Sequence, residues 1–100
     1  MTVKLVALYR KPDDVDAFTR HYEEVHMPLV AKTPHLMKTV VGKVTGSPMG
    51  EPPYFLMAEM IFPDAERFEE AMRSEENRAA GKDLMSFARD LVTLLVVEEK

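Results

Sequence analysis

The chain has 100 residues, of which 46% are hydrophobic and 30% charged, a balance typical of a folded globular protein. Its formal net charge of −4 provides no basic surface for a phosphate backbone, so we expect no nucleic-acid partner. The absence of cysteine excludes disulfide scaffolds, thiolate metal sites and cysteine nucleophiles. No apolar stretch has the length of a signal sequence or a membrane span. We therefore expect a cytoplasmic protein with one domain over residues 1–100 and no membrane contact.

The first predicted strand runs from Val3 to Tyr9, where the sequence VKLVALY is rich in strand-forming residues. The next residues favour a turn, and Asp13 or Asp14 can cap the free amides of a following helix. A helix that begins at Val15 and turns by about 100° per residue places an apolar stripe toward a core. The stripe consists of Val15, Phe18, Tyr22, Val25, His26 and Leu29.

Proline residues limit this first helix. Pro28 has no amide proton for the carbonyl of Glu24, so we expect the helix to kink or stop near His26 and to end before Pro34. The remaining predicted elements are a strand over 37–44, a loop over 46–53, a strand over 54–62, a helix from 64, a short helical turn from Ser74 to Gly81, and a strand over 91–97.

The order of these elements is β-α-β-β-α-β. Two right-handed crossovers then place both helices on one face of a four-stranded antiparallel sheet, which is the ferredoxin-like α+β arrangement. Three of the four strands are apolar at both odd and even positions, although a sheet with one wet face normally alternates. Something must therefore cover the second face, and a second copy of the chain is the simplest cover. We expect a homodimer that packs through these sheet faces.

The segment from Phe18 to Leu29 reads FTRHYEEVHMPL, and its H-Y-x-x-x-H-x-P-L pattern resembles the EthD family. Ala58-Glu59 and Phe62 in the third strand fit the same family pattern. So do residues of the second half of the chain, namely Ser74, Glu76, Ala79, Ala80, Asp83 and Phe87. The resemblance implies a dimeric α+β barrel, a fold shared by muconolactone isomerases, small polyketide cyclases, cofactor-free quinone-forming monooxygenases and some haem-binding proteins. Such a fold does not by itself decide function.

The family takes its name from a component of bacterial ethyl tert-butyl ether breakdown, and its members are often called reductases. No Gly-x-Gly-x-x-Gly segment follows the first strand, so the sequence does not support a nicotinamide or flavin site of the dinucleotide-binding type. We expect no cofactor and no metal for the chemistry considered below.

His26 is the main candidate for a catalytic residue, because it lies in the apolar stripe one turn from Tyr22. A histidine in this position can transfer protons near neutral pH. The alternative is structural, in which His26 completes a hydrogen-bond network around the carbonyl that Pro28 leaves without a partner.

Tyr22 and His21 flank this candidate. Tyr22 can orient a substrate oxygen or stabilise an enolate-like charge, or it is an aromatic core residue with one hydrogen-bond partner. His21 lies about 140° from His26 around a straight helix, so the two histidines cannot ligate one metal ion. The family pattern keeps His21 as a candidate ligand-binding residue.

Glu59 stands in a predominantly apolar strand, where an ionised carboxylate is costly unless it is paired. It is either a tuned general acid or base, or one partner of a salt bridge to Lys or Arg at the dimer seam. The bridge is the favoured interpretation, because structural ion pairs perturb carboxylates as readily as active sites do.

The resulting hypothesis is an EthD-like protein with a pocket for a small apolar or aromatic molecule between the first helix and the sheet. His26 and Tyr22 are assigned to its polar end, and Phe18, Val25 and Leu29 to its walls. The chemistry open to these residues is isomerisation, cyclisation or cofactor-free oxygenation of an easily oxidised phenol. The alternatives are a non-catalytic accessory or binding protein of a degradation pathway, and a haem-binding protein of the same fold.

Overall fold

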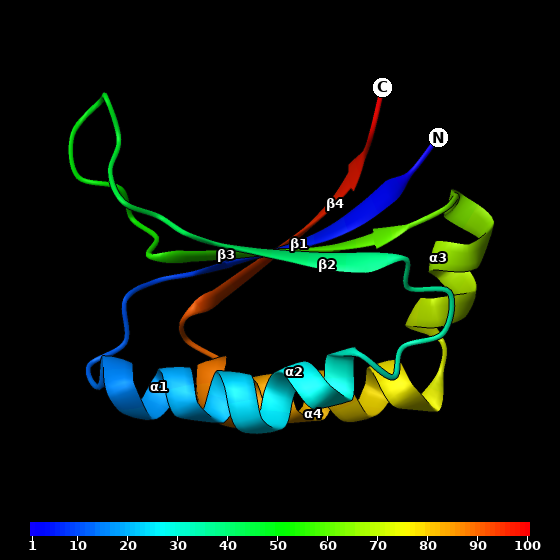
Figure 1. Ribbon diagram of the computed structural model, residues 1–100, viewed down its shortest axis with the longest axis horizontal. Coiled ribbons are helices and arrows are strands. Elements are labelled where there is room, and N and C mark those ends of the chain that lie inside the picture. The colour runs from blue at the N-terminus through cyan, green and yellow to red at the C-terminus, as the bar shows by residue number, and fades with distance from the viewer.

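A computed structural model describes all residues from 1 to 100, and in it one four-stranded antiparallel sheet packs against helices on one side (Figure 1). The elements are β1 (Val3–Tyr9), α1 (Val15–His21), the π-helical turn η1 (Tyr22–His26), α2 (Met27–Val30), β2 (Lys38–Lys43), β3 (Leu56–Phe62), α3 (Ala65–Met72), α4 (Glu75–Ala88) and β4 (Val92–Glu98). The predicted β-α-β-β-α-β order and the ferredoxin-like α+β class are confirmed. None of the helices combines the length and apolar character needed to cross a membrane.

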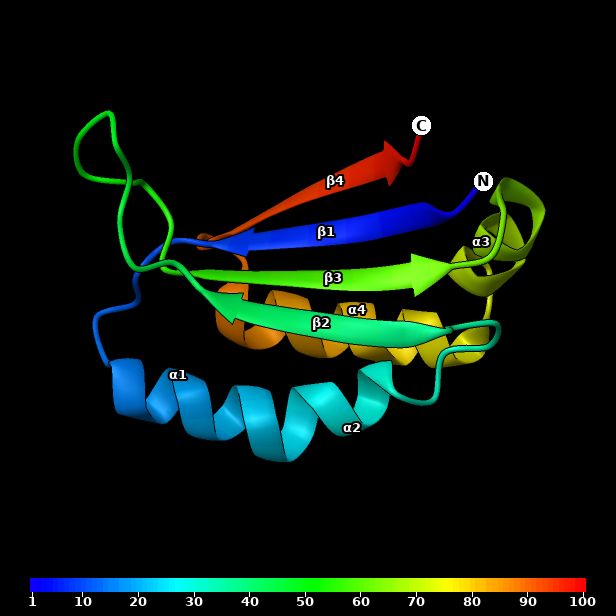
Figure 2. The ribbon, with the colours of Figure 1, turned by 45° about the horizontal axis from the view of Figure 1, so that its top comes forward.

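The strands lie in the order β2-β3-β1-β4, and every neighbouring pair is antiparallel (Figure 2). The first strand is central, with Tyr9 paired with Leu56 of β3 and with Val92 of β4. Since side chains alternate along a strand, residues aligned across this register share one face of the sheet. The register therefore decides which side chains meet the helices.

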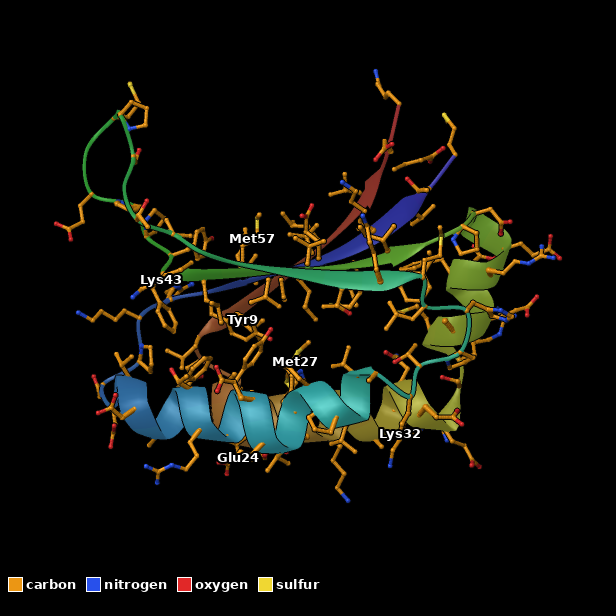
Figure 3. All side chains as sticks on the ribbon, in the orientation of Figure 1. Tyr9, Glu24, Met27, Lys32, Lys43 and Met57 are labelled. Carbon is orange, nitrogen blue, oxygen red and sulfur yellow. The ribbon has the colours of Figure 1, made fainter.

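One face of the sheet and the helices enclose the core. Tyr9 projects from the sheet toward the helices, whereas Met57 projects to the opposite side (Figure 3). The residues that form the buried core cluster come from β1, α1, η1, β3 and α4: they are Ala7, Tyr9, Phe18, Tyr22, Ala58, Leu84 and Ala88.

No element of this chain covers the opposite face of the sheet (Figure 1). We call this face the open face, and it is formed by the residues that alternate with the core positions, among them Val6, Leu8, Met57, Ile61, Leu95 and Val97. Leu95 is 46% exposed and Val97 is 40% exposed. As expected, the strands carry apolar side chains on both faces of the sheet, and one of these faces is left uncovered by the chain.

Glu59 lies on this open face, opposite Val6 in the register. Its Oε1 atom is 3.4 Å from Nζ of Lys4, and the same lysine is 3.6 Å from Glu99. The expected salt bridge to a lysine is therefore present. The sheet separates Glu59 from the helices, so Glu59 does not face the pocket between the helices and the sheet, and its alternative role as a general acid or base stays a prediction.

The first helix continues past the predicted stop at His26. Its second part is a π-helical turn in which the Met27 amide donates to the Tyr22 carbonyl, five residues earlier. Pro28 then falls in the first turn of α2, where a missing amide proton costs little. Of the two expected outcomes, a stop at His26 is wrong, whereas an irregularity of the helix is present there, because the wider turn restarts the hydrogen-bond pattern at a place that tolerates proline.

The second half of the chain also differs from the expectation at one point. A helix begins at Ser74, as predicted, and Ser74 caps it, with its hydroxyl accepting a hydrogen bond from the Asn77 amide at 3.0 Å. This helix, α4, does not close at Gly81 but runs on to Ala88. Packing of Ala80, Leu84 and Ala88 against the sheet outweighs the low helix propensity of one glycine.

Candidate functional site

The π-helical turn selects which residues of the first helix face the sheet. The buried positions are Phe18, Tyr22, His26 and Val30, which recur at every fourth residue. In a straight helix with 3.6 residues per turn, every fourth side chain points in a progressively different direction around the helix axis. The wider π-helical turn offsets this rotation, so all four side chains face the sheet. Two predicted positions are therefore wrong: Val25 is 42% exposed instead of facing the core, and Val30 takes the buried place expected for Leu29, which is only partly buried.

Asp83 of α4 holds both histidines of the first helix. Nε2 of His21 lies 2.9 Å from Oδ1 and 3.1 Å from Oδ2 of Asp83, and Nδ1 of His26 lies 3.1 Å from Oδ2. The 140° separation calculated for a straight helix does not apply, because the wide turn between the two histidines brings them to one side. We call this group the His21–Asp83–His26 cluster.

Phe87 packs against the cluster from α4. Its ring centroid is 4.4 Å from that of His21 and 5.2 Å from that of His26. His26 also contacts Tyr22, at 5.8 Å between ring centroids. These aromatic neighbours remove solvent from the carboxylate and fix the two imidazole rings, so the cluster is held in one geometry.

A pocket of about 170 Å³ lies between the helix face of the sheet and the helices α2 and α4. Ten of the fourteen residues that line it are hydrophobic, and His26 is the only histidine among them. The lining residues are Leu5, Ala7, Tyr9, His26, Val30, Thr33, Met60, Phe62, Met72, Asn77, Ala80, Gly81, Leu84 and Leu94. An apolar pocket with few polar groups is the usual form of a site for a small organic molecule.

The surroundings of His26 favour its neutral form. Burial lowers its pKa, and the charge of His21 acts in the same direction, while the hydrogen bond and the charge of Asp83 oppose them. A neutral imidazole that donates its Nδ1 proton to Asp83 carries the lone pair on Nε2, which has no hydrogen-bond partner in the chain. His26 thus presents an unpaired basic nitrogen, and its ring lines the pocket.

This lowered pKa has a consequence for stability below neutral pH. The unfolded chain takes up the His26 proton at its ordinary pKa of about 6.5, before the folded chain does, so the free energy of unfolding falls as the pH drops from there toward the folded pKa. We expect His26→Gln to lose this part of the pH dependence. Urea unfolding of both proteins between pH 8 and 5 measures it, and parallel curves for the two proteins would contradict the lowered pKa.

Tyr22 does not line the pocket. Its ring is buried between Tyr9, at a centroid distance of 5.6 Å, and Phe18, on which it stacks at 6.0 Å. Burial raises its pKa to about 12, so the phenol keeps its proton. The hydroxyl is buried and forms no hydrogen bond within the chain. The tyrosine that lines the pocket is Tyr9, whose pKa is also raised by burial and, to a smaller extent, by Tyr22.

We expect Tyr22→Phe to raise the free energy of unfolding by about 1 kcal/mol, because it removes a buried hydroxyl that has no partner. Tyr54→Phe is the matched control, since Tyr54 is only partly buried in a loop and should show no change. Urea unfolding of both variants measures the difference. A loss of stability in Tyr22→Phe would show that the hydroxyl is satisfied and would restore a polar role for it.

The structure thus separates the residues that the sequence grouped together. His26 lines the pocket, and His21 reaches it only through Asp83. Phe18 belongs to the aromatic core beside the pocket, and Val25 and Leu29 are not among the lining residues. The walls come instead from β1, β3, β4 and α4, with Val30 of α2 and Met72 of α3.

Asp83 is the member of the His21–Asp83–His26 cluster that the sequence alone does not place in the site, although it fits the EthD-like pattern. A signal was present, because Asp83 sits on α4 next to Leu84 and one turn from Ala80 and Phe87, which places a carboxylate at the border of an apolar helix face. No group of three or more potential ligand side chains is arranged to hold a metal ion.

Comparison with known proteins identifies related chains over the full length. A curated relative from Rhodococcus erythropolis, described as an uncharacterised 11.0 kDa protein in the thcB-thcC intergenic region, is 29% identical over 97 residues, which are 97% of this chain and 94% of the relative. The crystal structure of an EthD family protein from Bacillus halodurans C-125 has 48% identity and a TM-score of 0.94, with 100% of both chains covered.

More distant solved structures share the fold alone. A dimeric ferredoxin-like protein of unknown function from Thermobifida fusca YX has 18% identity and a TM-score of 0.72, covering 99% of this chain and 92% of its own. SnoaB, a cofactor-independent oxygenase from Streptomyces nogalater, has 10% identity and a TM-score of 0.71, covering 99% and 93%. The model of the EthD domain matches residues 10–90. This chain therefore belongs to the EthD family.

Proposed function

We propose that this protein binds a small, mainly apolar organic molecule in the pocket between α4 and the sheet, and that His26 acts there as a general base. The observation that carries the proposal is the buried imidazole of His26, whose Nδ1 is held by Asp83 at 3.1 Å and whose ring lines an apolar pocket. A carboxylate that fixes the tautomer and orientation of a histidine makes its other nitrogen an effective proton acceptor.

The chemistry that fits this arrangement is proton transfer at a weakly acidic carbon or oxygen. The proton passes from the ligand to Nε2 of His26, and the electron pair stays on the ligand as an enolate or phenolate. The carboxylate of Asp83 stabilises the imidazolium that forms, without taking the proton itself. This interaction is strong because His26 is only 5% exposed and little water screens it. We assign the donor to the new oxyanion to Tyr9, which lines the pocket and stays protonated.

Such a step begins isomerisation, cyclisation and the oxygenation of an activated phenol by molecular oxygen, the oxidant of the third reaction, alike. The fold is compatible with the third of these, since the similarly folded SnoaB is described as a cofactor-independent oxygenase. The residues of the pocket supply the base for any of the three reactions, and the bound molecule decides which one follows.

We also propose that the protein works as a homodimer through the open face of the sheet. The face carries exposed apolar residues such as Leu95 and Val97, and no segment of the chain covers it. A similarly folded protein from Thermobifida fusca is described as dimeric. Two copies packed face to face would bury more than about 1,200 Å² in total, the size of a stable interface.

Deuterium exchange at a carbon acid tests the catalytic proposal without knowledge of the natural substrate. Phenylacetone is neutral, has one ring and carries acidic protons next to its carbonyl. We expect the protein in D₂O to accelerate the incorporation of deuterium at this carbon, which proton NMR measures. The ligand should also shift the resonances of His26. Binding without acceleration would overturn the role of His26 as a base.

Gly81 offers a way to separate the pocket from the stability of the fold. It lies in the middle of α4 and lines the pocket, and a Cβ atom placed there meets no atom within 4 Å. We expect Gly81→Ala to stabilise the protein by about 0.5–1 kcal/mol, because alanine is the better helix former, and to weaken phenylacetone binding by filling part of the pocket. Melting temperature and NMR titration measure the two effects. Unchanged binding would place the ligand elsewhere.

A non-catalytic binding role is the second candidate, favoured by the predominance of apolar residues over polar ones in the pocket. It predicts phenylacetone binding with no exchange. Haem is less well supported, because an apolar cavity of about 150 Å³ accommodates a single benzene ring and the pocket is hardly larger, at about 170 Å³.

A further inference from the structure

The pocket has a second polar end, which the proposed chemistry at His26 does not use. Thr33 and Asn77 line the pocket, and together with His26 and Tyr9 they provide its polar side chains. Thr33 is only 9% exposed, and its hydroxyl takes part in none of the side-chain hydrogen bonds of the chain, although the oxygen itself is not fully buried. A hydroxyl that borders an apolar pocket and has no partner within the chain is available to bind a polar group of whatever occupies the pocket.

Asn77 is oriented by its neighbours in a way that leaves an acceptor free. Its Nδ2 donates to the Met72 carbonyl at 3.2 Å, and its backbone amide donates to Ser74 at 3.0 Å. The side-chain oxygen of Asn77 makes no hydrogen bond in the chain. Thr33 can both donate and accept, so the pair offers a ligand one donor and two acceptors.

This second end lies away from the His21–Asp83–His26 cluster. Asn77 precedes Asp83 by six residues on α4, a separation of about 9 Å along the helix axis. The helices α2 and α4 lie side by side and run in opposite directions, so Thr33, just after α2, lies at the same end as Asn77 (Figure 2). Apolar residues line the space between the two ends.

The pocket offers no permanently charged side chain to a ligand that arrives with a full charge. None of its fourteen lining residues is Lys, Arg, Asp or Glu, and the carboxylate of Asp83 is hydrogen-bonded to Nδ1 of His26. A carboxylate placed there would lose its hydration without gaining a cationic partner. The volume of about 170 Å³ is close to that of an apolar cavity known to hold one benzene ring.

From these features of the pocket we infer that the ligand is a neutral molecule of one substituted six-membered ring, with polar groups at opposite ends. This inference rests on the proposed function. One group meets His26, and the other is recognised by Thr33 and Asn77. Thr33 is then the residue that determines specificity.

Three probes and two variants test this inference by NMR titration at pH 7. The probes are 4-methylphenol, with one polar end, 4-hydroxybenzyl alcohol, with two, and 4-hydroxybenzoate, with a charge at the second end. We expect Thr33→Val to weaken binding of the alcohol by about three- to tenfold, the loss of one hydrogen bond, and to leave 4-methylphenol within about twofold. Thr33→Ser keeps the hydroxyl and should bind as the parent does. The benzoate should bind least well to all three proteins.

The outcomes show separately whether this inference fails and whether the proposed function on which it rests fails. If both neutral phenols bind the pocket and Thr33→Val affects them equally or not at all, the second polar end is refuted while the pocket stands. Tight binding of 4-hydroxybenzoate would refute the neutrality of the ligand. If neither phenol shifts the resonances of pocket residues, the proposed function and the inference both fail.

Discussion

Replacing His26 by glutamine is expected to lower the rate of deuterium incorporation into phenylacetone by about 10²- to 10⁴-fold, the usual contribution of a positioned general base. The amide of glutamine can still hydrogen-bond to Asp83 but has no basic nitrogen for the pocket. Since the His26 ring borders a pocket on one side and His21 still pairs with Asp83, the free energy of unfolding at pH 8 should change by less than about 1 kcal/mol.

Two further variants sharpen this result. Asp83→Asn leaves the imidazole of His26 in place but removes the charge that stabilises its protonated form, so the exchange rate should fall by at least about tenfold. His35→Gln is the matched control, because His35 is also paired with a carboxylate, at 3.0 Å from Glu70, but lies outside the pocket. It should leave the rate unchanged. A His26→Gln protein that keeps its rate but unfolds much more easily would assign His26 to structure alone.

The sequence predicted the fold well because strands and helix starts depend on local signals. The run VKLVALY gave the bounds of β1 correctly, and Asp64 and Ser74 cap the helices that follow them. The open face was also predictable, because strands that are apolar on both sides must be covered on both. Each of these features follows from a few neighbouring residues.

The site was harder to predict, because its geometry depends on a deviation from a regular helix. Positions calculated at 100° per residue placed Val25 in the core and kept His21 apart from His26. The π-helical turn shifts all positions after Tyr22, so Val25 turns outward and both histidines reach Asp83. A spacing of four between Phe18, Tyr22, His26 and Val30 was the available signal, and it becomes meaningful only once the wide turn is known.

The distant part of the site could not be predicted from the first helix at all. Asp83, Thr33 and Asn77 meet His26 or its pocket only because α2 and α4 pack side by side. Tyr9 and Tyr22 illustrate the same limit, since both are aromatic residues of the core, but only Tyr9 borders the pocket. Which of two neighbouring tyrosines meets a ligand is decided by tertiary packing.

Leu95→Lys is expected to convert the proposed homodimer into a monomer. Leu95 lies on the open face of β4, and a lysine there would be buried without a partner between two sheets, at a cost of several kcal/mol in each copy. Static light scattering at micromolar concentration should report a dimer for the parent protein and half that mass for the variant. The circular dichroism of the variant should stay that of a folded α+β protein.

Val96→Lys is the control that tests whether the effect depends on the face of the sheet that carries the new lysine. Val96 is the next residue of β4, but its side chain points to the other side of the sheet, where it is 62% exposed. The two variants have the same charge and lie on the same edge strand, so any general effect of a new lysine is common to both. We therefore expect Val96→Lys to stay dimeric. A monomeric parent protein, or dissociation by Val96→Lys but not by Leu95→Lys, would exclude the open face as the interface.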